Sequence, residues 1–171
     1  MNKIFQFQRL IKMKMHNSLF LLFAFFFALS SPAQESKKVK VTEVEKLITD
    51  SKGPLIINFW ATFCKPCMEE IPHFQKLQSK YEKDGLKIVF VSLDMQEAYP
   101  GKVNSFIRKR KMSSLWLDET NADYFCPVVD KTWSGAIPAT LFVSNKKQYR
   151  KFIEDPLSEE TLEKEIQTLL Q

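Results

Sequence analysis

The sequence predicts an α/β fold in a single domain, with a central mixed β-sheet flanked by helices. Two short apolar runs, 55–60 and 86–93, have the length and the β-branched content of buried strands, and a segment with helical periodicity separates them. A further strand pair, 140–144 and 148–153, is joined by the turn residues 145–147 and indicates a β-hairpin. A parallel strand–helix–strand unit beside an antiparallel hairpin makes the sheet mixed.

Apolar stripes at helical spacing predict four helices around this sheet. The first begins at a capping box formed by Thr42 and Glu45 and runs to about Thr49. The second covers residues 67–81, with an apolar stripe along one side and a kink at Pro72. This second helix is the one that connects the two buried strands.

The third and fourth helices lie in the second half of the chain. The third, 103–111, is basic, and the fourth follows an N-cap at Ser158, with Leu157 and Leu162 as a hydrophobic staple. Residues 113–137 are the least legible part of the chain, because turn signals interrupt any regular period. We find no internal repeat and no second domain.

The composition fits one globular domain and excludes several classes of protein. Of the 171 residues, 44% are hydrophobic and 26% are charged, with few glycines and no biased tract, which argues against a disordered or collagen-like chain. The formal charge of +5 is concentrated at the start, where 33 residues carry four basic and no acidic side chains. The remainder has 21 basic against 20 acidic residues and therefore no field that would hold nucleic acid.

Residues 1–33 have the three-part layout of a secretory signal peptide. A basic stretch precedes an unbroken apolar run at 19–29, and the small residues Ser31 and Ala33 suit the positions before a cleavage site. The apolar run spans about 16 Å as a helix, well short of a hydrocarbon core of roughly 30 Å. We therefore expect cleavage near Gln34, with an uncleaved membrane anchor as the alternative.

Export of the mature domain, residues 34–171, follows from either interpretation of the leader. That domain would lie in a compartment where disulfides persist, tethered to the membrane through residues 19–29 only if the leader is not cleaved. Translation from Met13 instead of Met1 would leave a leader of more ordinary length.

Two cysteines, Cys64 and Cys67, lie where the strand 55–60 passes into a helix. Cysteines three positions apart in a first helical turn share a face and need only slight adjustment to form a reversible disulfide. At the N-terminus of a helix the dipole lowers the pKa of a thiol, and the positive charge of Lys65 acts in the same direction. Pro66 is tolerated in this first turn, because a residue there has no intrahelical N–H bond to lose. The pattern predicts Cys64 as the exposed nucleophile and Cys67 as the thiol that resolves the mixed disulfide.

Residues 58–67, NFWATFCKPC, resemble the N-F-W-A-T-x-C-x-P-C pattern of the TlpA/ResA-like thiol-disulfide oxidoreductases, an envelope branch of the thioredoxin superfamily. Pro72 matches the helix-kinking proline of that family. The stretch AIPAT at 136–140 resembles its cis-proline loop, which faces the disulfide. The likeness covers roughly residues 40–171 and implies a thioredoxin-like fold.

The resemblance implies that the two cysteines are catalytic and that Trp60, Ile137 and Pro138 form the substrate-binding side of the pair. A cis X–Pro bond removes an N–H and leaves neighbouring backbone groups able to pair with an extended substrate strand. An ordinary trans turn at Pro138 is the alternative. Trp133, a few residues earlier, is expected either to line the substrate groove or to pack within its own loop.

The same resemblance implies a place in the periplasm or cell envelope of a bacterium and exchange of the dithiol with cysteine-containing envelope proteins. Envelope relatives are often reductases supplied by a membrane-linked thiol electron donor, including in cytochrome c maturation, so we expect reduction of substrates. No cofactor beyond the cysteine disulfide is expected. The direction depends on the reduction potential, which the sequence does not determine.

Proton transfer to Cys67 needs a group that the pattern leaves unassigned. The buried acid that cytosolic thioredoxins carry on the preceding strand is Asn58 here. Asp94, just after the second buried strand, and Glu97 are the nearest candidates by position. The alternative is that both are solvated carboxylates in a strand-to-helix turn.

A third cysteine and a histidine leave a metal-binding alternative open. Cys126 has apolar neighbours and is expected to be buried, although an odd thiol in an exported chain could also be reactive. Together with His73, the three cysteines would offer four ligands to zinc or copper. We expect no metal site, because the cysteine pair begins a helix in a redox motif, and we expect His73 at the surface. A redox-inactive interaction domain is the third class considered.

Overall fold

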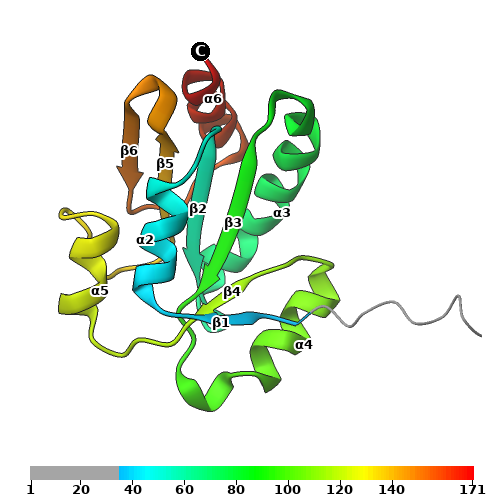
Figure 1. The fold of residues 1–171 in the computed structure, drawn as a ribbon. Coiled ribbons are helices and arrows are strands. Elements are labelled where there is room, and N and C mark those ends of the chain that lie inside the picture. The colour runs from blue at the N-terminus through cyan, green and yellow to red at the C-terminus, as the bar shows by residue number, and fades with distance from the viewer. Residues whose placement is uncertain (1–34) are drawn as a thin grey trace, which may run out of the picture. The chain divides into compact units, whose positions relative to one another are not determined.

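The computed structural model describes residues 35–171, which belong to one compact unit of five helices around a six-stranded sheet (Figure 1). The predicted leader, residues 1–33, lies outside the described residues. No helix within 35–171 is long and apolar enough to cross a membrane. The elements are β1 (Lys37–Val39), α2 (Val41–Thr49), β2 (Leu55–Trp60), α3 (Lys65–Lys80), β3 (Lys87–Ser92), α4 (Gly101–Arg110), β4 (Leu115–Leu117), α5 (Ala122–Val129), β5 (Ala139–Ser144), β6 (Tyr149–Ile153) and α6 (Glu159–Leu170).

The sheet has the strand order β1-β4-β3-β2-β5-β6 and is mixed, as the sequence predicts. β2 and β3 are parallel and are connected through α3, which confirms the strand–helix–strand unit. β5 is antiparallel to both β2 and β6, which confirms the hairpin. β2 therefore lies at the centre, and all six of its residues are buried.

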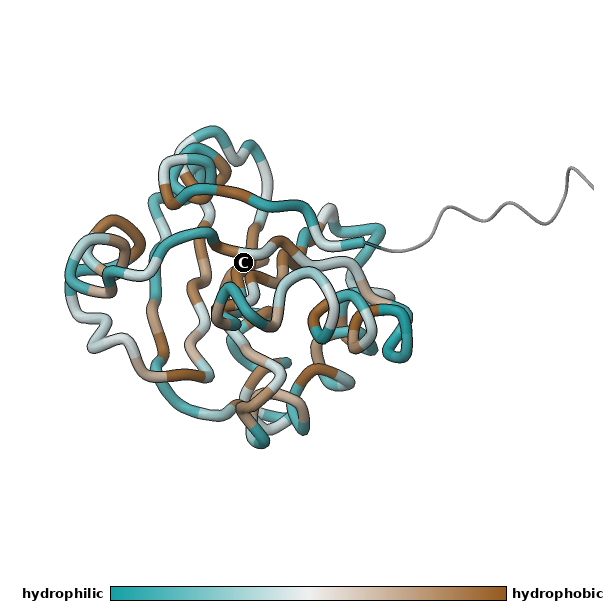
Figure 2. Tube along the Cα trace, turned by 90° about the horizontal axis from the view of Figure 1, so that it is seen from below, coloured by the Kyte–Doolittle hydropathy of each residue, from teal (hydrophilic) through white to brown (hydrophobic). Residues whose placement is uncertain are grey.

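Helices cover both faces of the sheet, and each face has its own hydrophobic core. α3, α4 and α6 pack on one face, and α2 and α5 pack on the other. Figure 2 shows hydrophobic and hydrophilic stretches alternating along the helices, as expected for elements that bury one side. The two cysteines Cys64 and Cys67 belong to the first core, whereas Cys126 belongs to the second.

The four predicted helices are present, but α2, α3 and α4 each begin two residues before their predicted starts. α2 begins at Val41, with Lys40 as its N-cap, so the capping box predicted at Thr42 is wrong. The Glu43 carboxylate accepts the Lys40 N–H at 3.0 Å and thereby closes the start of the helix two residues earlier than expected. At α6 the prediction is confirmed, because Ser158 Oγ accepts the Thr161 N–H at 3.2 Å.

Three elements escape the sequence patterns. β1 and β4 contain three residues each, too few for a period, and they pair with one another in parallel. α5 contains Pro127, a residue that normally ends a helical pattern. Its N-cap is Asn121, which the sequence marks only as a turn residue and whose side chain accepts the Asp123 N–H at 3.0 Å.

Candidate active site

The Cys64–Cys67 pair sits at the junction between the central strand β2 and the helix α3. A disulfide joins the two residues, whose Cα atoms are 5.3 Å apart. Cys64 is the N-cap of α3, and its Sγ accepts the Cys67 N–H at 3.3 Å. Pro66 lies in the first turn, where its missing N–H costs no helical bond. A thiolate formed at Cys64 would receive this N–H and the positive end of the helix dipole.

The two sulfur-bearing residues differ in how far they reach the surface. Cys64 is 7% exposed and Cys67 is fully buried, so a substrate can approach only the first of them. Lys65 is exposed and lies 3.8 Å from Glu69 on the next turn, which offsets part of its charge near the pair. The difference in exposure agrees with the predicted order, in which Cys64 attacks and Cys67 resolves.

The loop before β5 brings a second element against the disulfide. The Ile137–Pro138 peptide bond is cis, and the Ile137 carbonyl oxygen lies 3.7 Å from Cys64 Sγ. The register between β2 and β5, in which Phe59 pairs with Ala139, places this loop beside the end of β2. Ile137 is half-buried and Pro138 is buried, so a docking substrate would meet Ile137 first.

Trp60 lies in the same core as the cysteine pair, but it has no exposed surface. Its ring packs on Phe106, with centroids 4.8 Å apart, and its Nε1 donates to Ser114 Oγ at 3.0 Å. The resemblance implied that Trp60 takes part in substrate binding. In this structure its side chain supports the core under the cysteines and offers nothing to a substrate.

Glu70 is a buried carboxylate that the sequence predictions did not single out. It is 2% exposed and lies one turn after Cys67 on α3, on the same side of the helix. Its oxygens accept the Asn58 Nδ2 and the Leu157 N–H, each at 2.8 Å. Burial raises the pKa of Glu70 above its ordinary value, against the effect of these two hydrogen bonds. The available signal was an acidic residue three positions after Cys67 on a buried stripe.

Asp94 and Glu97, the two predicted proton-transfer candidates, occupy different environments. Asp94 is 3% exposed, so the alternative of a solvated carboxylate does not hold for it. Its oxygens accept the Thr62 N–H at 3.0 and 3.1 Å, the Thr62 hydroxyl, and the Ser92 Oγ at 2.7 Å. Glu97 is exposed in a single turn, as that alternative describes. Asp94 therefore holds the chain just before Cys64, whereas Glu97 faces solvent.

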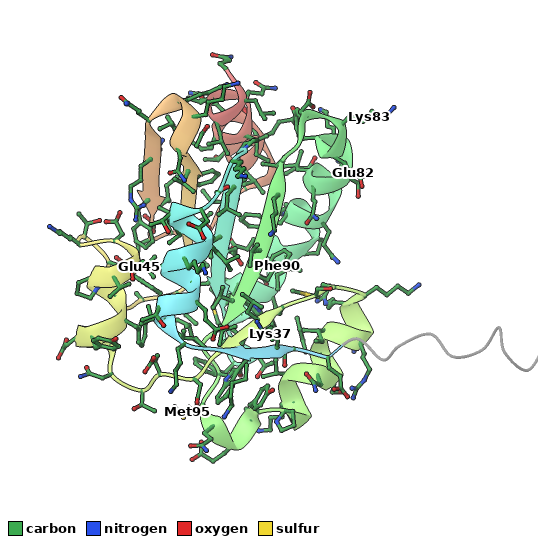
Figure 3. The ribbon with its side chains drawn as sticks, in the orientation of Figure 1. Lys37, Glu45, Glu82, Lys83, Phe90 and Met95 are labelled. Atoms are coloured by element: carbon green, nitrogen blue, oxygen red, sulfur yellow. A yellow bond between two sulfur atoms is a disulfide. The ribbon has the colours of Figure 1, made fainter. Side chains whose placement is uncertain are left out.

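A groove of about 530 Å³ opens beside the cysteine pair. Phe63, which precedes Cys64, and Met95, which follows Asp94, line it with exposed apolar side chains, and Ile137 lines its other side. Figure 3 shows Met95 at the end of the molecule opposite Glu82 and Lys83. The rest of the lining includes the carboxylates of Asp94, Glu97, Asp118 and Glu119. A groove with apolar and acidic side chains next to a reactive disulfide offers a site for a segment of polypeptide.

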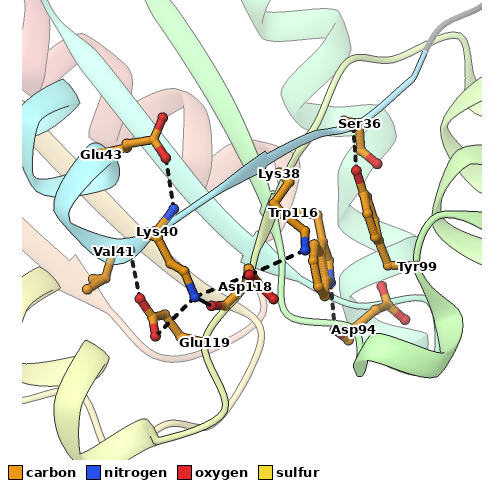
Figure 4. A network of polar contacts seen from close by, with 10 residues as sticks. All are labelled: Ser36, Lys38, Lys40, Val41, Glu43, Asp94, Tyr99, Trp116, Asp118 and Glu119. Carbon is orange, nitrogen blue, oxygen red and sulfur yellow. Dashed lines mark hydrogen bonds and ion pairs between the residues drawn. The ribbon is translucent and has the colours of Figure 1, made fainter.

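Strand β1 attaches to the loop that carries Asp94 through a stack of aromatic rings (Figure 4). Trp116 Nε1 donates to the Asp94 carbonyl at 2.7 Å, and the Tyr99 ring stacks on Trp116 with centroids 4.0 Å apart. Lys38 Nζ lies 5.1 Å from the centroid of Trp116 and 3.4 Å from an oxygen of Asp118. Trp116 and Asp118 also line the groove, so these contacts hold that side of the groove in place.

Of the four residues of the metal-binding alternative, only Cys64 and Cys67 lie together, and they are joined in a disulfide. Cys126 is a free thiol in the other core, and burial raises its pKa to about 11, with a further contribution from the charges of Glu154 and Asp123. His73 lies 3.5 Å from Glu159 near the surface. In the part of the chain that the structure describes, no group of three or more His, Cys, Asp or Glu side chains could hold a metal ion.

The fold and the site together define a thioredoxin-like protein: a mixed sheet with a disulfide at the start of its first crossover helix and a cis-proline loop beside it. Solved structures agree on the fold. A thiol:disulfide interchange protein of Chlorobium tepidum TLS aligns with a TM-score of 0.58, 19% identity, and coverage of 82% of this chain and 96% of that one. A thioredoxin-related protein of Neisseria meningitidis serogroup B aligns with a TM-score of 0.58 and 24% identity, over 71% and 89%.

The chain belongs to the AhpC/TSA family, whose sequence model matches residues 26–151. It is 31% identical over 130 residues to the thiol-disulfide oxidoreductase ResA of Oceanobacillus iheyensis, a match that covers 76% of this chain and 64% of that protein. It is 33% identical over 76 residues to the sporulation thiol-disulfide oxidoreductase A of Bacillus subtilis, over 44% and 46%. The chain thus spans less than two thirds of the length of both relatives.

Proposed function

We propose that this protein is a thiol-disulfide oxidoreductase that exchanges its Cys64–Cys67 pair with cysteines of other proteins. One observation carries the proposal: a disulfide at the N-terminus of α3, with only Cys64 reachable, lies 3.7 Å from the Ile137 carbonyl and beside an open groove. The names of the two relatives described above, both thiol-disulfide oxidoreductases, support it.

Reduction of a substrate disulfide then proceeds in two exchanges. The Cys64 thiolate attacks one substrate sulfur, forms a mixed disulfide, and releases the second substrate sulfur as a thiolate. Cys67 next attacks Cys64 Sγ, which releases the first substrate sulfur and leaves the Cys64–Cys67 disulfide. Two electrons pass from the protein dithiol to the substrate. Glu70, one turn from Cys67, accepts the proton that Cys67 must lose.

The direction and the partners follow from the resemblance of the motif to envelope reductases. In this proposal the protein acts outside the cytoplasm, in the periplasm or cell envelope, and reduces cysteine-containing proteins there, including in cytochrome c maturation. A membrane-linked thiol donor returns the disulfide to the dithiol. The reaction uses no cofactor other than the cysteine pair, and the signal peptide or anchor at residues 1–33 supplies export.

The test is insulin reduction by the full chain with dithiothreitol as the electron source. The wild type is expected to precipitate insulin B chain well above the uncatalysed rate, and Cys64→Ala is expected to return to that background. Cys67→Ala is expected to accumulate a mixed disulfide that mass mapping locates at Cys64. Cys126→Ala, which changes the buried thiol outside the site, serves as the control and keeps the wild-type rate. Wild-type activity in Cys64→Ala would exclude the proposal.

A redox titration against glutathione tests the direction. A reductase is expected to have a potential nearer about −270 mV than about −120 mV, the values typical of thioredoxin and of a strong oxidant. A potential at the oxidising end of this range would show that the protein forms disulfides in its substrates. Elemental analysis of the purified chain tests the metal-binding alternative separately, because it would reveal any metal held by the thiols.

A further inference from the structure

The segment that precedes the cis bond is held by the side chain of a residue from another part of the chain. Glu154 directly follows β6. Its carboxylate accepts the Ala136 N–H at 2.8 Å and the Ser134 N–H at 3.1 Å, and it also accepts the Ser134 hydroxyl. Burial alone would raise the pKa of Glu154, but these hydrogen bonds hold it below its ordinary value.

The hairpin explains why Glu154 reaches this segment. In the antiparallel register between β5 and β6, Ile153 pairs with Thr140, so the chain that continues past Ile153 runs beside the residues that come before β5. Glu154 therefore lies next to the loop on the side opposite the cysteines' strand β2. The contact connects two regions that are 18 residues apart in the sequence at its Ala136 end.

Trp133 holds the same segment from the other direction. Its Nε1 donates to the Ala136 carbonyl at 2.9 Å. The indole is 5% exposed and is fixed by three aromatic rings of the second core, so its donor cannot turn away. The ring centroids of Phe59, Phe125 and Phe152 lie 4.5, 5.6 and 5.7 Å from that of Trp133. Of the two alternatives for Trp133, the structure shows loop packing.

Ala136 and Ile137 therefore differ in whether their backbone polar groups are free to pair with a substrate. Both backbone polar groups of Ala136 are occupied by side chains, the N–H by Glu154 at 2.8 Å and more weakly by Ser134 Oγ at 3.4 Å, and the carbonyl by Trp133. Ile137 N–H makes no hydrogen bond to any residue within 35–171, and the Ile137 carbonyl contacts only Cys64 Sγ, at 3.7 Å. An extended chain that pairs with this loop by main-chain hydrogen bonds can use Ile137 and cannot use Ala136.

We propose that Glu154 is a positioning residue that sets the docking register of the substrate by occupying Ala136 and leaving Ile137 as the pairing position opposite Cys64. The inference rests on the proposed oxidoreductase function and goes beyond it, because it assigns substrate alignment to a residue outside the cysteine motif and the cis-proline loop. The substrate it describes is an extended polypeptide that carries a cysteine within reach of Cys64. A small dithiol, which makes no main-chain pairs, would not depend on Glu154.

The test compares Glu154→Ala and Glu154→Gln with Glu160→Gln, an exposed acidic residue of α6 that makes no ion pair within the described chain. For insulin reduction, Glu154→Ala is expected to raise KM about tenfold, which corresponds to ~1.4 kcal/mol, with kcat within about twofold. Glu154→Gln keeps one acceptor oxygen and is expected to lie between Glu154→Ala and the wild type. The rate at which dithiothreitol reduces the Cys64–Cys67 disulfide is expected to stay unchanged in all three variants. The reduction potential of the cysteine pair is expected to stay unchanged as well.

A structural readout accompanies the kinetics. Amide hydrogen exchange of Ala136, measured by NMR on the full chain, is expected to accelerate in Glu154→Ala and to remain slow in Glu160→Gln. If KM stays at the wild-type value in Glu154→Ala, or if the Ala136 amide remains protected, the inference is wrong. If the wild type and Glu160→Gln show no activity that depends on Cys64, the proposed function itself fails, and the two failures are thereby distinguished.

Discussion

Two buried carboxylates flank the cysteine pair, and they differ in what surrounds them. Glu70 is 2% exposed and Asp94 is 3% exposed. Asp94 accepts hydrogen bonds from three donor groups, two of them on Thr62 and one on Ser92. Glu70 accepts from two donors, and burial dominates its titration, so its pKa is raised. The two carboxylates are thus similarly buried but are held by different parts of the chain, Asp94 by Thr62 and Ser92 and Glu70 by Asn58 and the Leu157 backbone.

Asp94 and Glu70 also lie at different places relative to the cysteine pair. Asp94 binds the backbone of Thr62, two residues before Cys64, and so fixes the turn that leads into α3. Glu70 lies on α3 itself, one turn beyond Cys67, in the apolar interior. We therefore expect Asp94 to matter for stability and Glu70, as proposed above, for proton transfer.

The largest expected effect is on stability, from Asp94→Ala. The change leaves the Thr62 N–H, the Thr62 hydroxyl and the Ser92 hydroxyl without their acceptor, and we expect the free energy of unfolding to fall by about 3 kcal/mol. Urea unfolding measures it. Folded Asp94→Ala is expected to retain insulin reduction to within about tenfold, far above the Cys64→Ala background. A loss of unfolding free energy below about 1 kcal/mol would contradict the structural role of Asp94.

Glu70→Gln is expected to change catalysis instead. An amide cannot accept the proton from Cys67, so we expect kcat for insulin reduction to fall about 10²-fold at neutral pH. The dependence of kcat on pH should lose the limb that Glu70 produces, which a purely structural role would not alter. Glu160→Gln, an exposed carboxylate of α6 with no ion pair within residues 35–171, is the control. An unchanged pH profile in Glu70→Gln would remove Glu70 from the mechanism.

The raised pKa of Glu70 also predicts a smaller effect on stability. A carboxyl whose pKa is higher in the folded state binds more protons there, so its contribution is fully present below the ordinary value of 4.5. That contribution is lost as the pH rises through the higher folded value. Urea unfolding of the wild type and of Glu70→Gln across this pH range is expected to show that the difference in their unfolding free energies declines as the pH rises, because the other carboxylates are common to both. A difference that grows in favour of the wild type as the pH rises would show that the Glu70 pKa is lowered.

Glu97→Gln is expected to have the smallest effect. Asp94 and Glu97 are equivalent candidates by sequence position, but Glu97 is exposed and makes no hydrogen bond or ion pair within residues 35–171. We expect its unfolding free energy to stay within about 0.5 kcal/mol of the wild type and insulin reduction to stay within about twofold. A tenfold loss of activity would mean that the groove beside the cysteine pair uses Glu97.

The strands and helices that the sequence predicts are those with enough residues to show a period. The sequence predicts β2, β3 and the β5–β6 hairpin nearly to their ends, because short apolar runs bounded by turn residues are typical of buried strands. The patterns do not predict β1 and β4, since three residues show no alternation, and it is the pairing of β1 with β4 and of β4 with β3 that makes them strands. α5 was missed because Pro127 breaks the pattern that its buried residues would otherwise show.

The cysteine pair and its place at the start of a helix were determined by the sequence alone, because Cys64, Pro66 and Cys67 act through contacts within a single helical turn. Glu70, Asp94 and Glu154 could not be ranked in that way. Each is an acidic residue whose role depends on which backbone and side-chain donors the folded chain brings to it from far along the sequence. Only the tertiary structure supplies those donors and the burial that shifts the pKa of Glu70. It alone therefore distinguishes the carboxylate proposed to accept a proton, the carboxylate that binds the turn before Cys64, and the carboxylate that binds the segment before the cis bond.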